Sequence, residues 1–195
     1  LLINGHEKIV EKFELNKLDN LDYAILAVEN NIAFDVHNYI YKKDLNIKVI
    51  DNSSEFRMNK LTPLCIPEIN SNVLNYNSKF ISNPNCVTTL MCMVLKPLLK
   101  YGNIKRIIAS TYQAASGAGY KGLEELQTQT KESVGGYRDL TKDFWGKQYV
   151  YNVFSHNSSI NPLTLFNEEE MKLVRETKKI LQIDCKITAT CVRVP

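Results

Sequence analysis

The hydrophobic pattern of the first half of the chain predicts a strand, a helix and a second strand. Residues 22–28 and 46–51 form short apolar runs, and the segment 31–45 between them has the length of a helix. Unbroken apolar runs are typical of parallel strands that are buried on both faces and joined by a right-handed crossover helix. With a third strand predicted at residues 79–82, this half of the chain predicts an α/β fold with a parallel sheet.

The second half alternates longer helices and strands. The predicted helices cover residues 87–100, 120–131 and 168–181, and the predicted strands cover residues 104–112 and 185–194. The last helix begins with three glutamates and ends with lysines, which suits the helix dipole. Residues 135–162 are irregular, polar and aromatic, and we expect a long surface excursion there, with a subunit contact as one role for it.

Composition limits the classes of protein that the chain can belong to. With 195 residues and 44% hydrophobic content, the chain can bury a core large enough for one or two domains. A net charge of +3, evenly mixed along the chain, favours neither nucleic acid nor a membrane surface as a partner. Neither a signal-peptide layout nor an apolar run of about 18 residues is present. We therefore expect a cytoplasmic protein, with a plastid as the other location considered.

The cysteines form an odd set without a CxxC pair. They are Cys65, Cys86, Cys92, Cys185 and Cys191. This pattern suggests neither a disulfide framework nor a zinc site, so we expect reduced thiols and no metal.

One of these thiols, Cys86, lies at the start of the helix predicted from residue 87. Unpaired backbone N–H groups and the positive end of the helix dipole stabilise a thiolate there, which lowers the thiol pKa below about 8.5. Pro84 stiffens the turn, and Asn85 offers amide donors where an oxyanion or phosphate could bind. Cys86 is therefore a candidate nucleophile; the alternative is a buried cysteine that acts as a small hydrophobic residue.

Two loops that follow predicted strands have the composition of ligand-binding loops. Residues 51–58 (DNSSEFRM) combine small polar side chains with one arginine, which suits an anion at the carboxyl edge of a parallel sheet. Residues 113–119 (QAASGAG) are again small and follow the strand at 104–112.

Four groups of residues together resemble the aspartate-β-semialdehyde dehydrogenase family along nearly the whole chain. They are DNSSEFRM at 51–58, SNPNC at 82–86, STYQ at 110–113 with SGAG at 116–119, and TATCVRVP at 188–195. They stand in the family's order and at near-family spacing. The resemblance implies part of a Rossmann-like dinucleotide-binding domain over residues 1–84. An incomplete α+β catalytic and dimerisation domain, of the glyceraldehyde-3-phosphate-dehydrogenase-like type, would follow over residues 85–195.

The resemblance also implies an activity and its partners. Members of the family reduce aspartyl phosphate to aspartate semialdehyde with NADPH, in the biosynthesis of lysine, threonine, methionine and isoleucine. Cys86 would attack the acyl phosphate, expel phosphate and hold the acyl group as a thioester that accepts hydride. The implied partners are this small substrate, phosphate, NADP and a second copy of the chain, as a homodimer or a dimer of dimers.

The same resemblance assigns roles around the nucleophile. Gln113 would orient the acyl intermediate and donate to its oxygen, while a surface glutamine is the alternative. Arg193 would bind the substrate α-carboxylate, although an outward-facing arginine is what an alternating strand alone would favour. Arg57, Asn85 and Lys172 would hold the phosphate.

The remaining implied roles concern the substrate amino group and the nicotinamide. Glu169 lies one helical turn before Lys172 and would meet the amino group, with its neighbours Glu168 and Glu170 as alternatives. Ser116, Gly117 and Gly119 would approach the nicotinamide, where missing side chains let the backbone come close. A generic turn is the alternative for that loop.

Two parts of the family pattern have no counterpart in these residues. The glycine-rich cofactor turn would precede residue 1, and the catalytic histidine would follow Arg193 beyond the end of the chain; His6, His37 and His156 lie in other contexts. We therefore expect a central fragment that lacks useful turnover alone. The alternatives are another thiol-dependent acyl-phosphate reductase, such as glyceraldehyde-3-phosphate dehydrogenase or N-acetyl-glutamyl-phosphate reductase, and a non-catalytic fragment that keeps only folding and subunit contacts.

Overall fold

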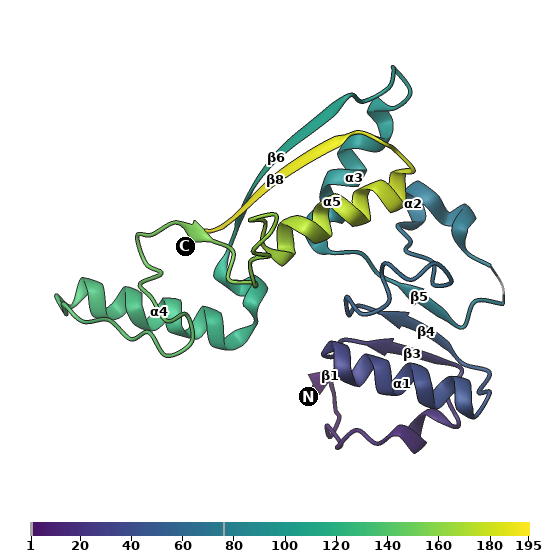
Figure 1. Cartoon of the computed structure of the whole chain (residues 1–195). Helices are drawn as coiled ribbons and strands as arrows, with labels where there is room; N and C mark the ends of the chain where they lie inside the picture. Colours follow the sequence, from purple (N-terminus) through teal and green to yellow (C-terminus); the bar gives the residue numbers. More distant parts are fainter. Residues whose placement is uncertain (1, 76) are drawn as a thin grey trace. The chain divides into compact units, whose positions relative to one another are not determined.

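A computed structural model describes residues 2–75 and 77–195 of the chain (Figure 1). These residues form two compact units, Leu1–Thr89 and Leu90–Pro195, and helix α3 (Cys86–Leu98) runs from the first into the second. The domain boundary that the resemblance implies after residue 84 stays a prediction. None of the helices in the described part of the chain is long and apolar enough to cross a membrane.

The first unit contains the predicted parallel sheet, with strands in the order β3-β4-β5. The strands are β3 (Tyr23–Leu26), β4 (Lys48–Asp51) and β5 (Phe80–Ser82), and helix α1 (Asn30–Lys42) connects β3 to β4. The register pairs Ile25 with Ile50 and Ile50 with Ile81. The predicted βαβ unit is confirmed.

Helix α1 covers one face of this sheet with a single apolar stripe. Ala33, Val36 and Ile40 recur at helical spacing, are fully buried and pack against Val49 and Phe80. Burial of a side chain such as that of Ile40 contributes about 1.5–3 kcal/mol. The stripe therefore fixes α1 against β4 and β5, and the loop with Arg57 follows β4 in the chain.

Several short elements complete the first unit. They are the antiparallel pair β1 (Leu2–Ile3) and β2 (His6–Glu7), the 3-10 turns η1 (Leu15–Leu18) and η2 (Ser71–Val73), and helix α2 (Pro67–Asn70). Segments of two to four residues are too short to show a hydrophobic period, so the sequence pattern did not indicate them.

The second unit is built on two long parallel strands (Figure 1). Strands β6 (Arg106–Gln113) and β8 (Lys186–Arg193) pair over eight residues, and the short β7 (Phe154–Ser155) adds to β8 in antiparallel orientation. Gln113 and Phe154 are therefore the register partners of Arg193 on its two sides. This register brings the carboxyl ends of β6 and β8 to the same edge of the sheet.

Three further elements follow the strands of the second unit. The turn η3 (Ala115–Ala118) and helix α4 (Tyr120–Val134) come after β6, and helix α5 (Glu168–Leu181) precedes β8. The predicted bounds of α5 are confirmed, because a capping box fixes its start. The Asn167 side chain accepts a hydrogen bond from the Glu170 N–H (2.9 Å), and the Glu170 carboxylate accepts one from the Asn167 N–H (2.9 Å).

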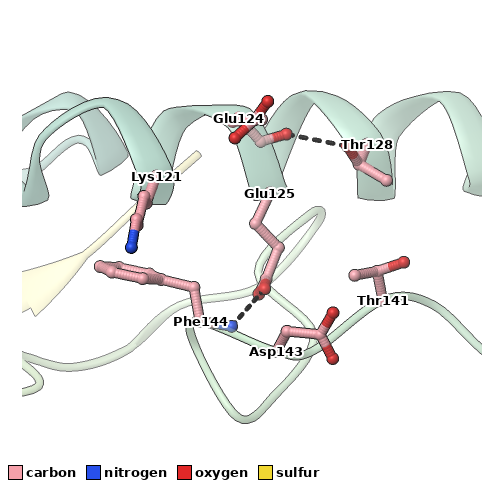
Figure 2. Close-up of a pocket in the computed structure, with 7 residues that line it drawn as sticks. All are labelled: Lys121, Glu124, Glu125, Thr128, Thr141, Asp143 and Phe144. Carbon is pink, nitrogen blue, oxygen red and sulfur yellow. Dashed lines mark hydrogen bonds between the residues drawn. The ribbon is translucent and has the colours of Figure 1, made fainter.

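The stretch that follows α4 is irregular and mostly exposed, as expected for a surface excursion, but part of it is buried and anchored to α4. Trp145 and Tyr149 are buried against Ala115, and the Glu125 carboxylate on α4 accepts hydrogen bonds from the Phe144 and Trp145 N–H groups. Figure 2 shows Glu125 reaching from α4 to this stretch at the side of a shallow pocket. The pocket contains none of the predicted site residues.

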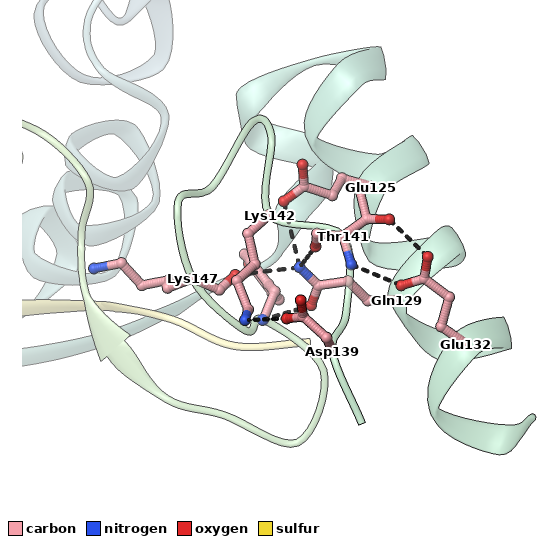
Figure 3. A network of polar contacts seen from close by, with 8 residues as sticks. Glu125, Gln129, Glu132, Asp139, Thr141, Lys142 and Lys147 are labelled. Atoms are coloured by element: carbon pink, nitrogen blue, oxygen red, sulfur yellow. Dashed lines mark hydrogen bonds and ion pairs between the residues drawn. The ribbon is translucent and has the colours of Figure 1, made fainter. Parts of the chain in front are cut away.

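A buried glutamine on α4, Gln129, holds the backbone of the irregular segment 141–150 in place. The Gln129 amide donates to the carbonyls of Thr141 (2.6 Å) and Lys147 (3.2 Å), and its oxygen accepts from the N–H groups of Tyr149 (2.7 Å) and Val150 (3.2 Å). Figure 3 shows the Gln129 side chain between α4 and the irregular segment. An irregular backbone can therefore be buried here, because one side chain satisfies its polar groups.

Candidate active site

Cys86 is the first residue of α3 and is exposed, whereas the other four cysteines are buried. Burial raises the pKa of the Cys92 thiol to about 11, and burial also raises the pKa of Cys65. The alternative of a buried structural cysteine therefore does not apply to Cys86. Its thiol is the accessible one for chemistry.

Asn85 caps the helix that begins at Cys86. Its Oδ1 atom accepts hydrogen bonds from the N–H groups of Val87 (2.9 Å) and Thr88 (3.3 Å). Unpaired N–H groups at this helix start were expected to stabilise a thiolate, but the N–H groups of Val87 and Thr88 bond to Asn85. Asn85 thus fixes the start of the nucleophile helix, which is a role that the sequence analysis did not assign to it.

The loop with Arg57 is held by hydrogen bonds at Arg57 itself and at Asp51, where the loop begins. The Arg57 guanidinium donates from Nη2 to the Asn52 carbonyl (2.8 Å) and is almost buried, and the Asp51 carboxylate accepts from the Ser53 N–H (2.8 Å). Burial alone would raise the pKa of Asp51, but the contacts from His37 and Ser53 outweigh it and lower this pKa. The predicted phosphate-binding arginine therefore sits on a fixed loop of the first unit.

His37 contributes to that fixation from α1. Its ring lies between the rings of Phe56 and Phe80, with centroid distances of 3.6 and 3.5 Å, and its Nε2 atom is 3.4 Å from Asp51 Oδ2. Phe56 immediately precedes Arg57 in the chain. The sequence pattern did not indicate this role, because it depends on rings that come from three separate elements.

In the second unit, Gln113 and Glu169 are brought together. Gln113 Nε2 donates to Glu169 Oε1 (3.0 Å), and Gln113 Oε1 accepts from the Thr111 hydroxyl (2.8 Å). These two contacts fix the orientation of the amide. Gln113 is therefore not a free surface glutamine, and its partner is one of the three glutamates considered.

The structure separates the three glutamates by their contacts. Glu170 belongs to the capping box and also accepts from the Cys191 N–H (3.0 Å), so its carboxylate holds α5 to β8. Glu168 is half-buried at the first position of α5. Glu169 is the glutamate that contacts Gln113, which favours it as the residue that meets a substrate.

Arg193, at the end of β8, faces inward rather than outward. Its side chain is 4% exposed, and it donates from Nη1 to the Ala114 carbonyl (3.0 Å) and from Nε to the Asn157 side chain (3.2 Å). The guanidinium also lies over the ring of Trp145, 5.6 Å from its centroid. A buried, planar cation held at three points is suited to recognise a carboxylate.

The small-residue loop after β6 leaves room for this arginine. A Cβ atom on Gly117 would lie 3.2 Å from Arg193 Nη1, and Gly119 has a φ of +83° at the start of α4. A Cβ atom on Gly122 would lie 2.8 Å from Trp145. The spacing G-x-G-x-x-G at residues 117–122 was a signal for close packing that the sequence analysis did not use.

His156 is a member of this cluster that sequence reasoning missed. Burial lowers its pKa most, Arg193 and Lys172 lower it further, and Glu169 and Glu170 act in the opposite direction. His156 therefore lies within electrostatic reach of the predicted residues on α5 and β8.

Of the predicted site residues, the second unit brings together Gln113, Glu169, Lys172 and Arg193, with Gly117 packed against Arg193. Cys86, Asn85 and Arg57 belong to the first unit.

Comparison with family models gives two matches, one in each half of the chain. Residues 2–76 match the model described as semialdehyde dehydrogenase, NAD binding domain, and residues 95–195 match semialdehyde dehydrogenase, dimerisation domain. These matches agree with the Rossmann-like and glyceraldehyde-3-phosphate-dehydrogenase-like parts that the resemblance implied.

Comparison with individual proteins gives a consistent result. An aspartate-semialdehyde dehydrogenase of Prochlorococcus marinus is 35% identical over 193 residues, which is 98% of this chain and 55% of that protein. One from Synechocystis is 44% identical over 148 residues, or 75% of this chain and 43% of that protein. The chain thus spans about half the length of these curated relatives.

Solved structures show the same likeness. Aspartate semialdehyde dehydrogenase II from Vibrio cholerae superposes with a TM-score of 0.85 at 32% identity, covering 98% of this chain and 57% of that chain. A second structure of that enzyme, complexed with ASA, gives a TM-score of 0.84 at 31% identity over 96% of this chain and 55% of that chain. Together with the two domain matches, these likenesses show that this chain belongs to the semialdehyde dehydrogenase family.

Proposed function

We propose that this chain carries the nucleophile and the substrate-binding residues of an aspartate-semialdehyde dehydrogenase. The observation that supports this best is the cluster of Gln113, Glu169 and Arg193 at the adjoining ends of β6, α5 and β8. A guanidinium fork matches the α-carboxylate of an amino acid, and a carboxylate matches its α-ammonium group. This set suits an amino-acid substrate better than a sugar phosphate, which argues against the glyceraldehyde-3-phosphate alternative.

The chemistry of the first step belongs to Cys86. Its thiolate attacks the acyl carbon of aspartyl phosphate, a C–S bond forms, and the C–O bond to phosphate breaks, with the electron pair leaving on phosphate. Arg57, Asn85 and Lys172 would bind the departing phosphate. Gln113 would donate to the acyl oxygen, where negative charge develops during the attack.

The reduction that follows requires a nicotinamide cofactor, for which we propose NADP. When bound, NADPH supplies the hydride that the acyl carbon accepts. Ser116, Gly117 and Gly119 would approach such a ring, because missing side chains let the backbone come close. Release of the aldehyde product would break the C–S bond and leave Cys86 as a thiolate again.

A homodimer is part of this proposal. The match to a dimerisation domain supports it, and so do large apolar side chains on the open face of β6, such as Ile108 (72% exposed) and Tyr112 (73% exposed). The product would enter the biosynthesis of lysine, threonine, methionine and isoleucine.

Competition between substrate and an alkylating agent tests the role of Cys86. Iodoacetamide at pH 7, followed by peptide mass spectrometry, should label Cys86 well before the four buried cysteines. Aspartate semialdehyde should slow this labelling, because the thiol adds to the aldehyde carbon and the aldehyde oxygen takes a proton. Acetaldehyde at equal concentration is the matched control, since it lacks the amino and carboxylate groups. Equal protection by the two aldehydes, or no preference for Cys86, would contradict the proposal.

A further inference from the structure

Three consecutive residues after β7 each contact the predicted substrate-binding cluster. The His156 N–H donates to the Cys191 carbonyl on β8 (2.9 Å), and Asn157 Oδ1 accepts from Arg193 Nε (3.2 Å). Ser158 Oγ accepts from the Glu169 N–H (3.2 Å). The segment 156–158 is therefore fixed to both the arginine and the glutamate that would bind the two charged groups of an amino acid.

The contacts of the His156 ring determine which nitrogen carries the proton. Nδ1 accepts a hydrogen bond from the Ser158 N–H (3.2 Å) and lies 3.1 Å from the Ser158 hydroxyl. A nitrogen that accepts from a backbone N–H has no proton of its own, so the neutral ring carries its proton on Nε2. The structure shows no hydrogen bond from Nε2 to the described residues.

The surroundings favour this neutral form. Arg193 from β8 and Lys172 from α5 act against a charged imidazole, and burial does so more strongly, while Glu169 and Glu170 from α5 oppose them. The ring is therefore a neutral donor in a cluster that otherwise consists of charged groups and the amides of Gln113 and Asn157. Such a donor can bind a carboxylate oxygen without adding another charge to the cluster.

We propose that His156 is a further substrate-binding residue, which donates from Nε2 to the carboxylate of the amino-acid substrate that Arg193 binds. This inference rests on the proposed function. It adds a second donor for that carboxylate and makes the segment 156–158 part of the specificity for α-amino acids.

A non-reactive probe makes binding measurable on this chain. L-2-aminobutyrate has the carbon skeleton, amino group and carboxylate of aspartate semialdehyde, but it lacks the aldehyde and cannot react with Cys86. Trp145 is the single tryptophan of the chain, and Arg193 lies over its ring. Tryptophan fluorescence therefore reports ligand at Arg193, and saturation-transfer NMR of the ligand gives a second affinity that does not depend on Trp145.

The variants separate a hydrogen-bond donor from a structural side chain. His156→Leu should weaken binding of L-2-aminobutyrate by about tenfold, because a hydrogen bond to a charged group is lost. His156→Gln retains an amide donor at a similar reach and should bind within about threefold of the wild type. His6→Leu, at an exposed histidine of the first unit, is the matched control and should change nothing. Melting temperatures of all variants check that folding is intact.

Each outcome decides between the two proposals. Wild-type affinity in His156→Leu, with binding lost in Arg193→Lys, would overturn the role of His156 and leave the proposed function in place. Equal losses in the leucine and glutamine variants would also overturn it, because the donor would then not matter. Absence of binding to the wild-type chain by both methods would contradict the proposed function itself.

Discussion

Gly117 lies directly against Arg193, because a Cβ atom on this glycine would lie 3.2 Å from Nη1 of the guanidinium. Arg193 is also held by the Ala114 carbonyl and by Asn157, so it cannot move away without loss of a hydrogen bond. The absence of a side chain at residue 117 is thus a condition for the position of the arginine. This relationship links the small-residue loop after β6 to the substrate-binding cluster.

Gly117→Ala should therefore weaken ligand binding with little change in stability. The methyl group would displace the guanidinium by a few tenths of an ångström, and we expect roughly three- to tenfold weaker binding of L-2-aminobutyrate. The free energy of unfolding should change by less than about 1 kcal/mol, because the restriction of the unfolded chain by alanine offsets the strain on the hydrogen bonds of Arg193. Fluorescence titration and urea unfolding measure the two effects. Ser116→Ala serves as the neighbouring control, and equal binding in both variants would contradict the prediction.

Gln129→Ala should destabilise the second unit strongly. The substitution removes the acceptor for the Tyr149 and Val150 N–H groups, which stay buried, and each unsatisfied group costs about 1–3 kcal/mol. We expect a loss of about 3 kcal/mol in the free energy of unfolding, measured by urea denaturation. Gln127→Ala, at an exposed position on the same helix, should stay within about 0.5 kcal/mol of the wild type. Similar values for both variants would show that the network in Figure 3 contributes little.

The sequence pattern predicted elements well where local signals were strong. Helix α5 has acids in its first turn, lysines in its last and Asn167 before it, and its bounds agree with the prediction. The stretch around Trp145 and Tyr149 has no hydrophobic period, and its burial depends on Gln129, which is 20 residues before Tyr149. Contacts of this kind cannot be predicted from local pattern, because they depend on which side chains the fold brings together.

The contacts within the candidate site could likewise not be predicted from local sequence pattern. The motifs around Cys86 and Gln113 could be recognised in the sequence, but the contact between Gln113 and Glu169 joins residues 56 positions apart. Among the three adjacent glutamates, only the structure shows that Glu170 is used to cap α5. The sequence context of His156 matches no motif, and its place in the cluster follows from the pairing of β7 with β8.

Asn167→Ala should reduce stability through the start of α5. Asn167 is 1% exposed, and its side chain accepts from the Glu170 N–H. Loss of an N-cap of this kind costs about 0.5–2 kcal/mol, which thermal unfolding can measure. Asn167→Ser keeps an acceptor for the N–H group and should recover most of that loss. If the serine and alanine variants unfold alike, the cap is not what stabilises α5.

His156 should make stability depend on pH in a defined window. Burial and the charges of Arg193 and Lys172 hold its folded-state pKa below the ordinary value of 6.5. As pH falls below 6.5, the unfolded chain takes up a proton on this ring before the folded chain does. The unfolded state then binds more protons, so the free energy of unfolding decreases as the pH is lowered through that window. It is fully regained when the pH is raised above the window.

His156→Gln removes this contribution, so its stability should vary less than that of the wild type between pH 7 and pH 5. Urea unfolding at intervals across this range measures the difference between the two curves, which cancels the contributions of groups that do not interact with His156. Protonation also forces a proton onto Nδ1, opposite the Ser158 N–H, so the loss has a structural cause within segment 156–158. Parallel curves for the two proteins would show that the ring titrates alike in the folded and unfolded states, and would contradict its burial beside Arg193.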